Sequence, residues 1–186
     1  MERRKFFGIL WGVLTGVGLC IILVVGWMVS KDYRFNIYKN SGYAFSIKYP
    51  ASWTLKENKN GAVAIFLSPL ENKLDIFQEN VNVVVQDFPQ KPMSLDKYTK
   101  IAINQMQVVF KEAIEIVESN STYVAGHPAY NFVFIGKGPE SEMKFKCVWV
   151  IIDEKRAYQI TYGTLSSQYD KYLGKVNSMI QSFKIY

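Results

Sequence analysis

The chain has 186 residues, of which 49% are hydrophobic, 15% are aromatic and 20% are charged, and its formal net charge is +6. This composition excludes an intrinsically disordered protein, and the length, less an N-terminal segment, fits one domain of about 150 residues. The basic residues are spread along the sequence without a concentrated run, so we expect no nucleic acid as a partner.

Residues 6–29 contain no charged side chain and are apolar or small almost throughout. A helix of this length measures about 36 Å, enough to cross a hydrocarbon core of about 30 Å. The apolar run is longer than that of a cleaved signal peptide, and no small-residue cleavage site follows it. We therefore predict a transmembrane helix that acts as an uncleaved signal anchor in the lipid bilayer.

The flanking charges predict the direction of this helix. Arg3, Arg4 and Lys5 precede the span, and clustered cations favour the cytoplasmic side. The predicted organisation is a cytoplasmic tail at residues 1–5, the transmembrane helix, a linker and leading strand at 30–42, and an extracytoplasmic domain at 43–186.

Three glycines recur at four-residue spacing within the span, at Gly8, Gly12 and Gly16. Such spacing leaves a flat stripe on one helix face, where a second transmembrane helix can approach closely. We interpret this stripe as a candidate face for self-association. The alternative is that glycine is simply common in membrane helices.

The sequence is poor in residues that perform chemistry. It has two cysteines, Cys20 within the span and Cys147 in a predicted strand, and one histidine, His127. The two cysteines are not expected to pair, and Cys147 is expected to be a small buried residue. Because a single histidine excludes a multi-histidine metal site and makes histidine-dependent catalysis improbable, we expect neither an enzyme nor a bound cofactor.

Apolar alternation and turn residues predict a series of short strands. They are expected at 43–49, 53–55, 62–67, 81–88, 113–117, 122–124, 129–135, 145–152 and 156–163. Tight turns are expected at 57–61 and at 126–128, where glycine and proline occur.

Two helices are expected between and after these strands. Ser94 is the predicted N-cap of the first, whose inward face would be Leu95, Tyr98, Ile101, Ala102, Gln105, Met106 and Val109. The second runs from about 167 to 183 and presents Tyr169, Tyr172, Leu173, Val176, Met179, Ile180 and Phe183. The order of elements predicts an α+β domain with an antiparallel sheet sandwiched between helices.

Two local patterns are considered as a possible calcium site and a possible glycosylation site. The loop at 70–79 contains Glu71, Asp75 and Glu79, but it lacks the ligand spacing and turn glycine of a calcium loop, so we expect a solvated loop. Asn120 begins an Asn-Ser-Thr triplet, which makes it a candidate glycosylation site if the domain lies outside the cytoplasm.

Several motifs, taken in chain order, resemble the PsbP family, the family of the extrinsic subunit of photosystem II. They are GYAFSIKYP at 42–50 with Trp53, FLSP at 66–69, ENVNVVV at 79–85, SLDKY at 94–98, GHPAY at 126–130, AYQITY at 157–162 and MIQSF at 179–183. The resemblance implies an α-β-α sandwich and a non-enzymatic protein that docks on a membrane complex. Family members of the oxygen-evolving complex help to retain calcium and chloride, so the resemblance implies calcium as a possible cofactor, although no ligand residue carries over.

The predicted function is that of a membrane-tethered extracytoplasmic module that is accessory to an unidentified membrane or envelope protein. Two alternatives stay open. One is a factor for the oxygen-evolving complex or the assembly of photosystem II. The other is a domain that binds a small ligand between its sheet and a helix.

Overall fold

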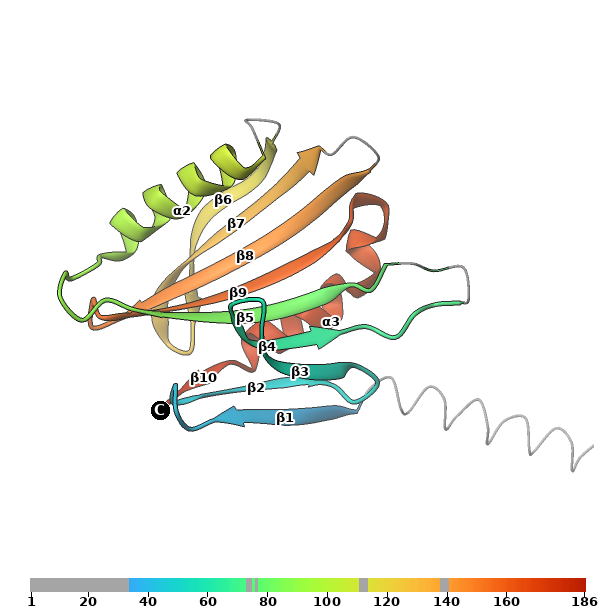
Figure 1. Ribbon diagram of the computed structural model, residues 1–186, viewed down its shortest axis with the longest axis horizontal. Coiled ribbons are helices and arrows are strands. Elements are labelled where there is room, and N and C mark those ends of the chain that lie inside the picture. Colours follow the sequence, from blue (N-terminus) through green and yellow to red (C-terminus); the bar gives the residue numbers. More distant parts are fainter. Residues whose placement is uncertain (1–33, 73–74, 76, 111–113, 138–140) are drawn as a thin grey trace, which may run out of the picture.

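The computed structural model describes residues 34–72, 75, 77–110, 114–137 and 141–186 (Figure 1). The predicted transmembrane helix, with Gly8, Gly12 and Gly16, lies outside these residues and stays a prediction. Within the described part of the chain, no helix is both long enough and apolar enough to cross a membrane.

The strands form two antiparallel sheets. The small sheet has the order β1-β2-β10 and the large sheet the order β3-β4-β5-β9-β8-β7-β6. The strand bounds are β1 Phe35–Asn40, β2 Phe45–Pro50, β3 Thr54–Lys59, β4 Ala62–Leu67, β5 Asn80–Asp87, β6 Ile114–Val124, β7 His127–Lys137, β8 Glu142–Ile152, β9 Arg156–Leu165 and β10 Lys184–Ile185.

Helices cover the two faces of the large sheet (Figure 1). Helix α2 (Leu95–Val109) lies on one face, over a core that includes Phe132, Phe134 and Trp149. Helix α3 (Tyr169–Gln181), which follows a 3-10 turn η1 (Ser166–Gln168), packs on the opposite face together with the small sheet. The mixed fold with antiparallel strands and two helices confirms the predicted class.

The predicted single sheet is wrong in one respect, because β1, β2 and β10 form a sheet separate from the large one. Strand β10 pairs with β2, with Lys184 opposite Ser46 and Ile185 opposite Phe45. The Tyr186 hydroxyl also donates to the Phe45 carbonyl oxygen at 3.0 Å. A two-residue strand has no periodicity to read, so the sequence offered no sign of it.

The region from 113 to 128 also differs from expectation. The two predicted short strands are one strand, β6, whose register shifts between Ile116 and Glu118 because of a bulge. The turn to β7 is made by Ala125 and Gly126, with φ of 53° and 83°. Positive φ at both central positions matches the twist of a tight hairpin, so His127 and Pro128 fall in the strand rather than in the turn.

Other strand boundaries differ from the predicted ones by a few residues. Ala44 has a φ of 52°, so the chain turns there and β2 starts at Phe45 instead of residue 43. Strand β3 continues to Lys59, which shortens the turn predicted at 57–61 to Asn60 and Gly61.

Helix α2 begins as predicted but is rotated about its axis. Ser94 caps it by accepting the backbone N–H of Lys97 at 3.3 Å. The buried residues are Tyr98, Thr99 and Ala102, whereas Ile101 and Val109, predicted to face inward, are 39% and 74% exposed. Gln105 is exposed as well.

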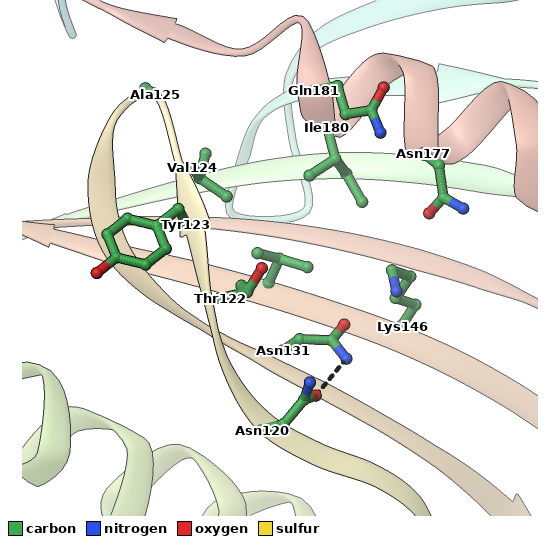
Figure 2. Close-up of a pocket in the computed structure, with 11 residues that line it drawn as sticks. Asn120, Thr122, Tyr123, Val124, Ala125, Asn131, Lys146, Asn177, Ile180 and Gln181 are labelled. Carbon is green, nitrogen blue, oxygen red and sulfur yellow. Dashed lines mark hydrogen bonds between the residues drawn. The ribbon is translucent and has the colours of Figure 1, made fainter.

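Helix α3 matches its predicted face closely. Its buried residues, together with Phe183 just after it, are Tyr169, Tyr172, Val176, Met179 and Ile180. Because α3 lies over the middle of the sheet, the end of that face formed by β6 and β7 keeps an open space beside the helix (Figure 2).

Candidate functional site: a polar cleft beside α3

A cleft of about 410 Å³ lies between α3 and the strands β6, β7 and β8 (Figure 2). Its volume falls within the range of small-molecule sites. The lining residues are Asn120, Thr122, Tyr123, Val124, Ala125, Asn131, Lys146, Val148, Asn177, Ile180 and Gln181. Amide, hydroxyl and ammonium groups make this lining polar, unlike the apolar core next to it.

Strand alternation brings these residues to one face. On β7, Ala129 and Val133 are buried in the core under α3, so Asn131 between them points the same way. In the antiparallel register Asn131 stands opposite Asn120 of β6 and Val148 of β8. The cleft is therefore a direct product of the pairing of β6, β7 and β8.

Asn131 is the most constrained group in the cleft. The residue is 6% exposed, and its Nδ2 donates to Asn120 Oδ1 and to Glu118 Oε2, both at 2.9 Å. A carboxylate oxygen accepts and does not donate, so this contact identifies which end of the amide is nitrogen. Asn131 Oδ1 therefore points away from both partners, toward the space below α3 (Figure 2).

Asn131 Oδ1 is buried and finds no hydrogen-bond donor among the described residues. A buried acceptor left without a donor costs about 1–3 kcal/mol. The atom borders a cleft that is large enough for water or a ligand, so a bound molecule would offset this cost.

Lys146 supplies the single charge among the described residues that line the cleft. Lys144, two residues earlier on the same face of β8, instead lies 4.1 Å above the Tyr169 ring. Asn177 and Ile180 project from α3 toward the strands, and the Tyr123 ring points away from the cleft (Figure 2). The arrangement offers several donors and acceptors and one positive charge to a molecule of modest size.

The structure places the predicted glycosylation residue at this cleft. Asn120 is exposed on the edge strand β6, and its Oδ1 accepts the hydrogen bond from Asn131. Glycosylation of Asn120 stays a prediction. The other cleft residues were not foreseen, although one sign was present, since Asn131 is a polar residue at an inward position of an otherwise apolar strand.

Within the described ranges, the histidine and the one cysteine lie elsewhere. His127 is exposed at the start of β7. Cys147 is 1% exposed on the α2 side of the sheet, and burial raises the pKa of its thiol to about 12. Cys147 is thus a protonated packing residue, as predicted, because nucleophilic cysteines need an accessible thiolate.

The acidic loop is only partly solvated. Asp75 accepts the backbone N–H groups of Glu71 and Phe77 at 2.8 and 3.1 Å, which lowers the pKa of its carboxyl group. Glu79, expected in solvent, is 3% exposed and accepts a hydrogen bond from Ser68 Oγ at 2.7 Å. In the described ranges, no group of three or more His, Cys, Asp or Glu residues is placed to hold a metal ion.

Exposed apolar side chains occur at the end of α2 and at the start of β6. We define this apolar corner as Val108 and Val109 of α2 with Ile116 and Val117 of β6, which are 73%, 74%, 50% and 43% exposed. Val109 also lines a groove of about 290 Å³ beside α2, together with Ile101 and Met106. Because exposed apolar side chains are a feature of contact surfaces, we take this corner as a candidate contact surface.

A third surface is formed by the outer face of the small sheet. We define this lysine face as Lys39, Lys48 and Lys184 with Ile37 and Ser46. The pairing Lys39–Ser46–Lys184 runs across the three strands, and Ile37 stands opposite Lys48. Three cations therefore share one side of a small sheet.

The PsbP family model matches residues 33–185, which is most of the chain and all of both sheets and helices. The chain therefore belongs to the PsbP family, a family of accessory or binding modules. This confirms the resemblance found in the sequence motifs.

Solved structures share the fold at low sequence identity. The chain is similar to cyanobacterial PsbP from Synechocystis, with a TM-score of 0.59, 16% identity, and 82% of this chain and 92% of that chain covered. It is similar to LpqN, a Mycobacterium tuberculosis protein involved in cell envelope biogenesis, with a TM-score of 0.60 and 10% identity. The match covers 82% of this chain and 90% of LpqN. The Ran-binding protein Mog1p of Saccharomyces cerevisiae matches with a TM-score of 0.56 and 6% identity. The match covers 82% of this chain and 95% of Mog1p. No match was found among curated proteins.

Proposed function

We propose that this protein is a non-enzymatic accessory module, held at the outer surface of a membrane by its N-terminal apolar segment. In this proposal the PsbP domain docks on a neighbouring membrane or envelope protein. The observation that supports it most directly is the position of residues 6–29, an uncharged span that precedes a domain of a family of accessory modules.

The length of the connection supports a position close to the lipid. Five residues, 30–34, separate the apolar segment from Phe35, where β1 begins. Fully extended, they span about 17 Å. The small sheet, which carries the lysine face, would then lie near the headgroups. Tethering would also raise the local concentration of the domain near membrane partners, so weak contacts would suffice.

The topology of the chain is tested by labelling intact cells. Tyr123 is 75% exposed, so a Tyr123→Cys variant of the full-length chain in a Cys20→Ser background provides an accessible thiol. A membrane-impermeant maleimide added outside the cells should label this variant. Labelling that appears only after the inner membrane is permeabilised would place the domain in the cytoplasm and overturn the proposal.

The docking step is tested at the apolar corner. Val109→Glu adds a charge to this surface, and Asn104→Glu on the same helix, where Asn104 is exposed, is its matched control. After crosslinking in membranes, partners that co-purify with the wild type and with Asn104→Glu should be lost from Val109→Glu. Photosystem II subunits among these partners would support the oxygen-evolving-complex alternative, and the absence of any reproducible partner would count against docking.

A second candidate function is the binding of a small ligand, which the polar cleft beside α3 favours. The supporting observation is Asn131 Oδ1, an acceptor that faces the cleft and has no donor within the part of the chain that the structure describes. Ligand binding and docking use different surfaces, so each can fail without the other.

A further inference from the structure

We infer that the cleft between α3 and β6–β8 binds a small hydroxylated monocarboxylate of the sugar-acid type. A ligand hydroxyl would donate to Asn131 Oδ1, and the ligand carboxylate would pair with Lys146. This inference rests on the ligand-binding candidate above and is independent of the membrane tether.

The need for a ligand donor follows from how Asn131 is held. Both N–H groups of its amide are used, one by Glu118 and one by Asn120, so the side chain cannot turn over without losing two hydrogen bonds. The carbonyl oxygen is therefore directed into the cleft by its neighbours. An amide oxygen accepts one or two hydrogen bonds, and a hydroxyl group is a donor of matching strength.

The other lining groups favour hydroxyls over a purely charged ligand. Thr122, Asn177 and Gln181 surround the cleft with a hydroxyl and two amides, each of which both donates and accepts. A ligand with several hydroxyls has the same dual character. A ligand that only accepts hydrogen bonds would leave the Asn131 acceptor unsatisfied.

The charge of the lining indicates a single negative charge on the ligand. Among the described residues, Lys146 is the one charged residue that lines the cleft, whereas Lys144 on the same face of β8 lies over the Tyr169 ring. One ammonium group matches the single negative charge of a carboxylate. The cleft volume of about 410 Å³ suits a molecule the size of a monosaccharide.

The experiment is a titration of the full-length protein, in detergent micelles, with small-molecule probes. Binding is measured by calorimetry and by NMR of the asparagine and glutamine side-chain amides. The probes are D-glucuronate, which has hydroxyls and a carboxylate, D-glucose, which has only hydroxyls, and acetate, which has only the carboxylate. Glycine, with an ammonium group in place of hydroxyls, is the fourth probe. Glucuronate should bind at least tenfold more tightly than the other three.

Two variants with one control assign the contacts. Lys146→Met keeps the apolar stem and removes the charge, and it should reduce the affinity for glucuronate at least tenfold, to that of glucose. Asn131→Leu removes the acceptor and should weaken both sugars. Lys144→Met changes the neighbouring lysine, which lies over Tyr169, and should leave the affinity unchanged. If Asn131→Leu fails to fold, Asn177→Ala on α3 tests the site in its place, because Asn177 also lines the cleft, and it should weaken the binding of both sugars.

Several outcomes would overturn the inference. They are the absence of glucuronate binding by the folded protein at millimolar concentration, equal or tighter binding of acetate, glucose or glycine, and unchanged affinity in Lys146→Met. None of them bears on membrane topology or on partner capture at the apolar corner, so failure here is distinguishable from failure of the docking proposal.

Discussion

Trp149 of β8 donates a buried hydrogen bond from its indole Nε1 to Oγ1 of Thr99 on α2, at 2.8 Å. The two residues are 0% and 8% exposed, and Tyr98 packs edge-on against the same indole at 6.1 Å between ring centroids. This contact turns the Tyr98–Thr99 side of α2 toward the sheet. Ile101 and Val109 are left outside as a consequence.

Thr99→Val should destabilise the folded protein, because it keeps the shape of the side chain but leaves the Trp149 N–H buried without an acceptor. The expected loss in the free energy of unfolding is about 1–3 kcal/mol. Urea unfolding of the full-length protein in detergent, followed by tryptophan fluorescence, measures it. Thr99→Ser keeps the hydroxyl, so its free energy of unfolding should fall clearly less. Equal decreases in the two variants would contradict the role of the hydrogen bond.

Gly136→Ala and Gly174→Ala should have opposite effects on the stability of the folded protein. A Cβ atom at Gly136 would lie 2.5 Å from Cε1 of Phe110, whose ring packs against Phe134 and Phe145. Displacing this ring should cost about 1–3 kcal/mol. Gly174 lies in α3 with no atom within 4 Å of the added Cβ, so alanine there should stabilise by about 0.5–1 kcal/mol. Thermal unfolding of both variants checks the prediction, and a neutral Gly136→Ala would show that Phe110 moves freely.

Asp87 and Arg156 should give the protein a pH-dependent increment of stability. Arg156 donates from Nη2 to Asp87 Oδ2 at 3.1 Å, and this hydrogen bonding lowers the pKa of the Asp87 carboxyl group. A lowered pKa in the folded state stabilises the protein above the ordinary aspartate pKa of about 4, and the effect is lost as the pH falls through the lowered value.

The Asp87 side chain is 47% exposed, so the increment should be small, about 0.2–1 kcal/mol. Asp87→Asn should therefore be less stable than wild type at pH 7 and equal to it at pH 2, measured by urea unfolding. In an Arg156→Met background the same substitution should have no effect at either pH. A persistent difference in that background would contradict the pairing.

Cys147 should resist alkylation in the folded protein. It is 1% exposed, and its pKa of about 12 leaves almost no thiolate at pH 8. In a Cys20→Ser background, iodoacetamide should react only after urea is added. The Tyr123→Cys variant serves as the control, because a thiol at that exposed position should react at once in native buffer. Rapid reaction of Cys147 in native buffer would show that the sheet opens beneath α2.

Much of the local structure could be predicted because it depends on neighbours in sequence. The Ser94 cap, the inward face of α3 and the continuous apolar strand β4 match their patterns. Each depends on contacts between residues a few positions apart, where periodicity and capping rules apply. The family motifs are equally local, since they are strand cores and turns.

The candidate site could not be predicted because its residues come from four separate elements. Asn120 and Asn131 meet across one hairpin, whereas Lys146 and Asn177 come from β8 and α3. The sequence indicated a polar residue inside β7, but it could not show that the amide oxygen of Asn131 would find no donor among the residues that the structure describes. That outcome depends on where Glu118 lies, and Glu118 is placed by the bulge in β6.

The sequence by itself determined an uncharged N-terminal segment, the strands and helices of a PsbP domain, and a chain with little catalytic chemistry. Tertiary structure alone decided the pairing of β10 with β2, the rotation of α2 toward Trp149, and the polar cleft beside α3. The physical reason is how far apart in the sequence the contacting residues lie. Local patterns are set by neighbouring residues, whereas these features depend on contacts such as that of the Tyr158 hydroxyl with the Tyr43 carbonyl, 115 residues apart.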